Sequence, residues 1–188
     1  MRHFDHNAHH HPVLLAAVPA GARTAVDVGC GNGAFARLLA ARGLAVTAVD
    51  RAVEVSAPGV EFRRADALTD DLGGPYDFVS CIAALHHMPL EAGLARLRSL
   101  VAPGGAVAVL GLAREEDAWD RALSLASVPL NFARRLVRDD PRGTAPVAEP
   151  SRALREIRAA ADDLLPGARF RRHLYWRYSM SWTAPGTG

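Results

Sequence analysis

The feature that most constrains this fold is a short apolar stretch that leads directly into a glycine-rich turn and then into a helical stretch. Thr24 to Val28 has the composition of a buried strand, and the turn Gly29-Cys30-Gly31-Asn32-Gly33 follows it without a break. Ala34 to Arg42 then places its apolar side chains on one helical face. Because glycine tolerates a positive φ and has no side chain, such a turn lets a ligand lie directly against the backbone. The pattern therefore predicts an α/β fold with a nucleotide-like ligand at this turn.

Short apolar segments and amphipathic segments continue to alternate after this unit. We predict further strands at Ala45 to Val49, Val60 to Arg63, Tyr76 to Ile82 and Ala106 to Leu112, with helices at Leu90 to Val101 and from a cap at Ser151 to Leu164. This alternation predicts a doubly wound, mostly parallel sheet with helices on both faces. The last segment, Leu174 to Trp182, alternates in polarity. Periodicity alone favours one long strand there, and a hairpin is the alternative.

Length and composition indicate one globular domain. The chain has 188 residues, of which 49% are hydrophobic and 22% charged, which suits one full core and is too little for two ordinary domains. Within a single domain spanning residues 1–188, we expect an N-terminal arm or helix at 1–18 and a lid-like insertion at 113–150, where the periodic pattern weakens. No segment has the apolar length of a membrane span, and the histidine-rich start does not resemble a secretory signal, so we expect a cytoplasmic protein.

Charge and residue usage exclude several classes of function. All 22 basic residues are arginines, so a Walker-type phosphate loop and Schiff-base or pyridoxal catalysis, which need a lysine, cannot operate. The net charge of +2 is mild and the arginines are scattered, which gives no support for nucleic-acid binding. Cys30 and Cys81 indicate buried thiols rather than a disulfide framework. We predict no metal site at the N-terminal histidines, which lack carboxylate or cysteine partners and are His3, His6, His9, His10 and His11.

Carboxylates accompany the glycine turn. Asp27 precedes it, Asp50 ends the second predicted strand and Asp66 follows the third. At the position of Asp50 a carboxylate can accept hydrogen bonds from both hydroxyls of a ribose, and a second carboxylate suits the amino group of adenine. Acids near the turn favour a sulfonium nucleoside over a diphosphate, because they would repel phosphates. The glycines alone also satisfy the dinucleotide fingerprint, so a nicotinamide-dependent oxidoreductase is the alternative.

A family resemblance accompanies these motifs. The stretch Asp27 to Gly33, the carboxylates Asp50 and Asp66, and the segment Tyr76 to Val79 resemble successive motifs of class I S-adenosylmethionine-dependent methyltransferases, over most of the chain. The segment Ala83 to Pro89 and both chain ends resemble those of small, stand-alone bacterial members. The resemblance implies a seven-stranded α/β sheet with an antiparallel C-terminal hairpin, so it favours the hairpin over the single long strand.

The same resemblance implies a cofactor, an acceptor and a set of binding residues. The expected cofactor is S-adenosyl-L-methionine, and the expected acceptor is an oxygen, nitrogen or carbon atom of a small molecule. A protein that binds the cofactor without methylating is a further alternative. By the resemblance, the glycines and Asp27 hold the methionine part, Asp50 the ribose, and Asp66 with Ala67 the adenine. The full set is Asp27, Gly29, Gly31, Asn32, Gly33, Asp50, Arg51, Asp66, Ala67, Cys81, Asn7 and His11.

Two further segments lead to predictions about the reaction and the pocket. His86 follows the fourth predicted strand, at the edge where such folds bind ligands, and its imidazole could deprotonate an acceptor. Alternatively, alignment alone drives the displacement and no base is needed. The link Arg51 to Gly59 is too short for the crossover helix that usually joins two parallel strands. We therefore expect a vestigial helix there and a more open adenine side of the pocket.

Overall fold

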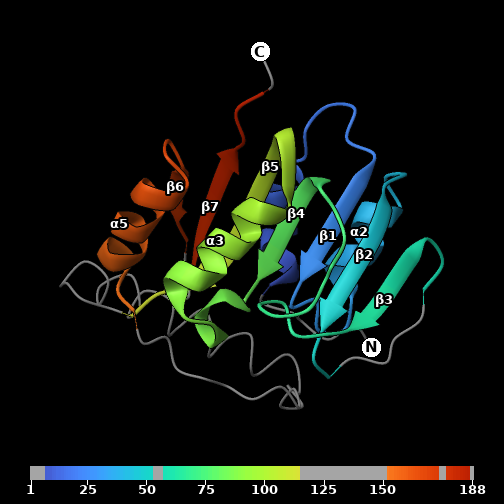
Figure 1. Ribbon diagram of the computed structural model, residues 1–188, viewed down its shortest axis with the longest axis horizontal. Helices are drawn as coiled ribbons and strands as arrows, with labels where there is room; N and C mark the ends of the chain where they lie inside the picture. The colour runs from blue at the N-terminus through green and yellow to red at the C-terminus, as the bar shows by residue number, and fades with distance from the viewer. Residues whose placement is uncertain (1–6, 53–56, 115–151, 174–176, 187–188) are drawn as a thin grey trace, which may run out of the picture.

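The computed structural model describes residues 7–52, 57–114, 152–173 and 177–186. These residues form the strands β1 (Thr24–Val28), β2 (Ala45–Asp50), β3 (Val60–Arg64), β4 (Tyr76–Ile82), β5 (Val101–Leu112), β6 (Arg169–Arg172) and β7 (Arg177–Thr183). Their helical elements are η1 (Ala8–His10), α1 (His11–Leu15), α2 (Ala34–Ala40), η2 (Leu85–His87), α3 (Leu90–Leu100) and α5 (Leu154–Leu164), as Figure 1 shows. Each strand and helix predicted ahead of the lid is present, with small differences at its ends.

The strands form one seven-stranded sheet of order β3-β2-β1-β4-β5-β7-β6. The strands β1 to β5 pair in parallel, whereas β7 is antiparallel to both β5 and β6. The predicted α/β fold is therefore confirmed, and β6 and β7 form the antiparallel C-terminal hairpin. The described residues 177–182 of the segment Leu174 to Trp182 lie in β7, and the partner strand β6 precedes that segment. The arrowheads of β1, β2 and β4 lie at one edge of the sheet (Figure 1), here called the carboxyl edge and formed by the strand ends Val28, Asp50, Ile82 and Leu112. Ligands of doubly wound sheets bind at this edge.

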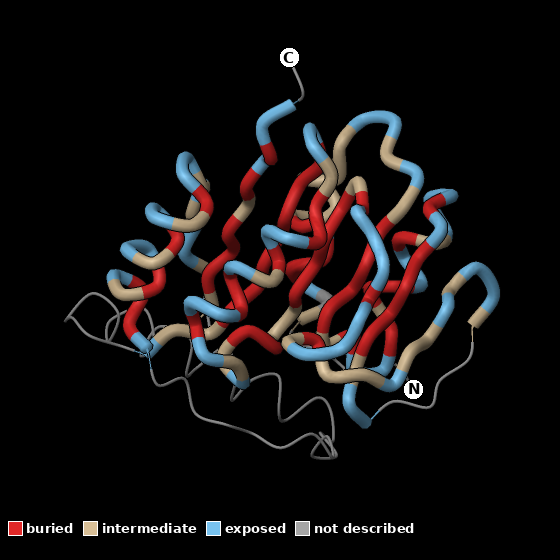
Figure 2. The backbone as a smooth tube through the Cα atoms, viewed as in Figure 1, coloured by how far each residue is buried: buried red, intermediate tan, exposed pale blue. Residues whose placement is uncertain are grey.

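Helices cover both faces of the sheet. On one face α1 and α2 contribute Leu14 and Leu39 to a core with the strands, and on the other face α3 and α5 contribute Leu94 and Ile157. Figure 2 shows the buried strands in the middle of the molecule and the exposed outer surfaces of the helices around them. No helix in the described part of the chain combines the length and apolarity needed to cross a membrane.

The fifth strand begins earlier than predicted. Val101 already pairs with Tyr76, and the register then shifts so that Ala106 pairs with Phe78. Gly104, at φ +75°, lies in the irregular stretch between these pairs. The sequence Pro103-Gly104-Gly105, which lies ahead of the predicted strand Ala106 to Leu112, is therefore a bulge within the observed strand.

The helix α5 is capped by a different residue from the one predicted. Ser151 lies outside the described residues, and Ala153 occupies the cap position instead, where its N–H donates to Glu156 Oε2 at 2.9 Å.

Most of the predicted lid, residues 115–150, lies outside the described residues too. Its two flanks are adjacent, because the N–H of Arg114 donates to the carbonyl oxygen of Arg152 at 2.8 Å.

The link between β2 and β3 is short. Residues 53–56 are not described, and the described residues 51–52 and 57–59 of this link form no helix. The chain enters β3 through a turn in which the N–H of Val60 donates to the carbonyl oxygen of Ala57 at 3.2 Å.

Candidate functional site

The glycine turn joins β1 to α2 at the carboxyl edge. Gly29, Gly31 and Gly33 have φ angles of +70°, +52° and +71°, a region that residues with a side chain rarely adopt. The N–H groups of Gly29 and Cys30 donate to the carbonyl oxygen of Val49 at 2.8 and 3.0 Å, which ties the turn to the end of β2. The glycines predicted from the sequence are therefore required by the backbone itself.

The surroundings of the three glycines differ. A Cβ at Gly29 would lie 2.2 Å from the Cβ of Ala84, and a Cβ at Gly33 would lie 2.5 Å from the ring of Phe62. Both positions are closed by packing against the protein. At Gly31 no heavy atom of the described residues outside the turn's own neighbouring residues lies within 4 Å of the corresponding position. The middle of the turn therefore faces open space in which a ligand can lie against the backbone.

Asp50 lies beside this open position. Its Oδ2 accepts a hydrogen bond from the N–H of Gly31 at 2.9 Å, and its Oδ1 accepts one from the N–H of Ala52 at 2.9 Å. The two bonds fix the carboxylate at the turn and leave each oxygen able to accept another hydrogen bond. Asp50 and Gly31 were predicted together, and the structure brings them into direct contact.

Asp27 is buried in β1 just ahead of the turn. Its Oδ1 accepts a hydrogen bond from Ser80 Oγ at 2.7 Å, across the pairing of β1 with β4. Burial raises the pKa of Asp27 to about 6, the Ser80 hydrogen bond acts against this rise, and the carboxylate of Asp50 adds to it. Ser80 could not be predicted from the sequence, because its position opposite Asp27 depends on the register between strands that are far apart in the chain.

Asp66 lies just beyond β3 and is already engaged. Its Oδ2 forms an ion pair with the guanidinium of Arg51, and its Oδ1 accepts a hydrogen bond from the N–H of Leu68 at 2.9 Å. The Leu68 bond, followed by the Arg51 bond, holds the pKa of Asp66 below its usual range. Ala67 is buried, and its carbonyl oxygen accepts a hydrogen bond from Arg96 Nε at 2.9 Å. A ligand amine at Asp66 would therefore compete with Arg51.

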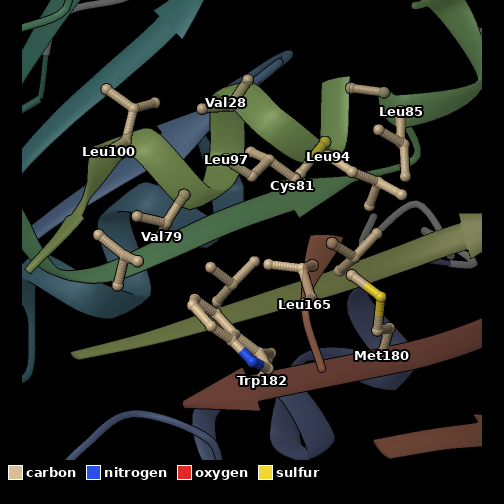
Figure 3. Close-up of a cluster of buried hydrophobic side chains, with 14 of the residues drawn as sticks. Val28, Val79, Cys81, Leu85, Leu94, Leu97, Leu100, Leu165, Met180 and Trp182 are labelled. Carbon is tan, nitrogen blue, oxygen red and sulfur yellow. The ribbon is translucent and has the colours of Figure 1, made fainter. Parts of the chain in front are cut away.

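Cys81 lies inside the core. Its side chain is fully buried in β4 and belongs to the cluster that contains Val28 and Leu94 (Figure 3). Burial raises the pKa of Cys81 to about 12, and burial likewise raises the pKa of Cys30, in the turn, to about 12. Both thiols are neutral, and the Cys81 side chain could meet a ligand only if the core opened.

The N-terminal segment, consisting of η1 and α1, contacts two parts of the fold. Asn7 Oδ1 accepts hydrogen bonds from Arg177 Nε and Nη2, at 3.2 and 3.1 Å, where β7 begins at the carboxyl edge. His11 is buried, and its ring lies 5.0 Å from that of Phe35 in the first turn of α2. The two N-terminal residues predicted from the resemblance thus lie between β7 and the helix that follows the glycine turn.

A histidine cluster, which the sequence analysis did not predict, holds this segment against the C-terminal hairpin. His10 is buried, with its ring 4.7 Å from that of His173 and 5.2 Å from that of His9, and its Nε2 has no hydrogen-bond partner among the described residues. Burial first, and His173 second, lower the pKa of His10 to about 4. His173 Nε2 lies 2.8 Å from Ser179 Oγ. Burial also holds the pKa of His173 below its usual range, so His10 and His173 are neutral near pH 7.

His86 lies in η2, just after β4. It is half-buried, its ring lies 4.1 Å from that of His87, and its buried Nδ1 has no hydrogen-bond partner in the part of the chain that the structure describes. Burial, and then His87, lower the pKa of His86 to about 4. Ala83, between β4 and η2, has a φ of +50°, a strained value for a residue with a side chain. His86 therefore presents a neutral imidazole beside a strained segment of the carboxyl edge.

The donor set suits a nucleoside with a cationic group. Among the described residues, no group of histidine, cysteine and carboxylate side chains could hold a metal ion, and His3 and His6 lie outside those residues. S-adenosylmethionine carries ribose hydroxyls, an amino group and a sulfonium. The open face of Gly31 and the adjacent carboxylates of Asp50 and Asp27 match these groups, so the residues present fit this cofactor.

Comparisons with known proteins bear on this site. The family model described as a methyltransferase domain matches residues 1–156. An uncharacterised methyltransferase of Mycobacterium tuberculosis is 36% identical, over 95% of this chain and 96% of its own length. A ubiquinone biosynthesis O-methyltransferase of Paracidovorax citrulli is 30% identical, over 78% of this chain and 66% of its own length. The chain thus spans just under two thirds of that enzyme.

A solved structure shares the fold. The 1,6-didemethyltoxoflavin-N1-methyltransferase of Burkholderia thailandensis, solved with 1,6-didemethyltoxoflavin and S-adenosylhomocysteine bound, has a TM-score of 0.61 and covers 93% of this chain and 76% of its own. At 17% identity the likeness concerns the fold alone. It is the fold that the motifs of the glycine turn imply.

Proposed function

Because the chain belongs to the family of methyltransferase domains, we propose that it transfers the methyl group of S-adenosyl-L-methionine to an oxygen, nitrogen or carbon atom of a small molecule. The observation that carries this proposal is the open face of Gly31 beside the carboxylate of Asp50. Family membership favours it over the nicotinamide-dependent oxidoreductase that the glycine pattern alone allows. The printed names of the relatives, which include a ubiquinone biosynthesis enzyme, support a small-molecule acceptor.

The proposed cofactor contacts follow the carboxyl edge. The backbone of the glycine turn, with Asp27 close behind it, binds the methionine part, and Asp50 accepts hydrogen bonds from the ribose hydroxyls. Asp66 lies on the adenine side, where Arg51 must move or share the carboxylate. The other proposed contacts are Gly29, Gly31, Asn32, Gly33, Ala67, Asn7 and His11, and the side chain of Cys81 joins them only if the core around it opens.

The chemistry needs little from the protein besides alignment. Bound S-adenosylmethionine supplies a methyl group on a positively charged sulfur, which makes that methyl group electrophilic. The protein holds the acceptor in line with it and excludes water, and such positioning accounts for much of the rate in bimolecular displacements. We propose that neutral His86 accepts a hydrogen bond from the acceptor and orients it. With a pKa of about 4, His86 is a weak base at neutral pH.

The domain assignment completes the proposal. Residues 1–188 form one domain, residues 1–18 an arm over the cofactor, and residues 113–150 a lid beside the acceptor. The hydrogen bond between Arg114 and Arg152 supports the lid, because the insertion leaves and returns at one point beyond β5. We propose a cytoplasmic protein that acts on neither nucleic acid nor membrane.

Calorimetry with S-adenosylmethionine and S-adenosylhomocysteine tests the cofactor. Asp50→Ala should lose about 1.5–3 kcal/mol of binding free energy, the scale of hydrogen bonds to a charged group. Asp66→Ala should lose less, because Asp66 already binds Arg51. Asp163→Ala, on the exposed surface of α5, is the matched control and should bind like the wild type. Absence of heat with either compound would refute the proposal, and binding of NADH instead would favour the oxidoreductase.

A further inference from the structure

Ser80 has a buried hydroxyl that lies close to two acceptor atoms, Asp27 Oδ1 and the carbonyl oxygen of Val26. It is 0% exposed, in β4, and lies opposite Asp27 of β1. Its Oγ is 2.7 Å from Asp27 Oδ1 and 3.3 Å from the carbonyl oxygen of Val26. A hydroxyl has one proton, so it cannot donate fully to both acceptors. The shorter bond, to the carboxylate, is also the stronger one.

The other groups around Asp27 do not replace this bond. The carboxylate of Asp50 opposes ionisation of Asp27, and the backbone N–H of Ala36 favours it less than Ser80 does. The thiols of Cys30 and Cys81 also face Asp27, and both are neutral. None of these described groups carries a positive charge. Ser80 is therefore the strongest described contact that favours the ionised carboxylate.

We propose that Ser80 is a positioning residue that keeps the Asp27 carboxylate ionised and correctly oriented behind the glycine turn, ready to receive the cationic amino group of the cofactor. This inference rests on the proposed function, which places the methionine part at Asp27. Ser80 itself does not touch the cofactor. Its effect on binding passes through Asp27 alone.

The proposal predicts a characteristic pH dependence. With a pKa of about 6, Asp27 is mostly ionised at pH 7 in the wild type. In Ser80→Ala, burial and Asp50 are no longer opposed by the hydroxyl, so the pKa of Asp27 rises. Cofactor affinity at pH 7 then falls about tenfold for each pH unit by which the new pKa exceeds 7, and it recovers as the pH is raised.

The experiment is calorimetric titration of S-adenosylhomocysteine between about pH 5.5 and about pH 8.5. The wild type should lose affinity below about pH 6, and the midpoint should move upward by at least about one unit in Ser80→Ala. Ser80→Thr, which keeps the hydroxyl, should restore the wild-type midpoint. Ser80→Cys keeps the approximate volume but donates weakly, so it should behave like Ser80→Ala if the hydrogen bond matters rather than the packing.

Two further variants test whether Ser80 acts through Asp27. The Asp27→Asn variant should bind S-adenosylhomocysteine weakly at every pH, and adding Ser80→Ala to it should cause no further loss of affinity. Ser99→Ala is the matched control, because the Ser99 hydroxyl donates to the carbonyl oxygen of Arg96 at 2.8 Å near the exposed end of α3. It should leave the pH profile unchanged.

The outcomes separate the inference from the function beneath it. A Ser80→Ala variant that loses affinity equally at all pH values, or keeps the wild-type midpoint, overturns the role of Ser80. Absence of binding by the wild type at every pH refutes the proposed function instead. In that case, carboxyl NMR titration of Asp27 in the ligand-free protein still tests the pair. An Asp27 midpoint that Ser80→Ala does not raise would overturn the inference.

Discussion

Replacing single glycines by alanine should separate binding from folding at the glycine turn. Alanine at a positive φ costs about 1–2 kcal/mol in backbone energy. At Gly29 the new Cβ would also lie 2.2 Å from Ala84 Cβ, and relieving such an overlap typically adds about 1–3 kcal/mol. Gly29→Ala should therefore destabilise the protein by about 2–5 kcal/mol, a large share of the roughly 5–15 kcal/mol that stabilises a typical domain.

Gly31→Ala should have the opposite balance. In the described part of the chain no heavy atom beyond the adjacent residues lies within 4 Å of its Cβ position, so the stability cost is the backbone energy alone, about 1–2 kcal/mol. The same Cβ occupies the space proposed for the cofactor, and overpacking there should weaken binding by about 1–3 kcal/mol, or about 5- to 150-fold. Gly43→Ala is the control, because Gly43 has φ +87° and open surroundings at the opposite edge of the sheet.

Two measurements on the same three variants decide the matter. Urea denaturation gives the free energy of unfolding, and calorimetry with S-adenosylhomocysteine gives the affinity. Gly43→Ala and Gly31→Ala should unfold at similar urea concentrations, and only Gly31→Ala should bind weakly. Wild-type affinity in Gly31→Ala would mean that no ligand lies against the middle of the turn. A loss of stability in Gly31→Ala as large as that in Gly29→Ala would contradict the open geometry.

Two further predictions concern histidines. Folding lowers the pKa of His10 from 6.5 to about 4, so between these pH values the unfolded protein binds a proton that the folded protein does not. The stability that neutral His10 contributes should therefore be complete above pH 6.5 and be lost as the pH falls from 6.5 towards 4. Measured by urea denaturation at several pH values, His10→Phe should lose less stability towards low pH than the control His87→Phe. An unchanged pH dependence of the free energy of unfolding in His10→Phe would contradict this prediction. His86→Asn should lower kcat by up to about 100-fold, the cost of misplacing the reacting atoms by about 1 Å, without moving the pH profile between about pH 6 and about pH 8. A wild-type limb near pH 6.5 that disappears in the variant would instead make His86 an ordinary titrating base.

The local parts of the site could be predicted from the sequence. The glycine turn follows from a strand that runs into three glycines, and Asp50 follows from its place at the end of the next strand. Both depend on short stretches whose geometry is fixed by backbone sterics. The contacts of Ser80 and His173 could not be predicted in this way. They depend on strand register and on the packing of segments that lie far apart in the chain, for which spacing contains no signal.

The hydrogen-bond partners of the acidic residues could not be predicted from their positions in the sequence. Asp50 and Asp66 both lie at strand ends at the carboxyl edge, so the sequence predicts both as carboxylates that bind the cofactor. Among the described residues Asp50 accepts hydrogen bonds from backbone N–H groups, which leave room for ribose hydroxyls on the same oxygens. Asp66 binds the guanidinium of Arg51, which lies in the shortened link after β2. We therefore infer that the short link affects the adenine side through the arginine it presents to Asp66.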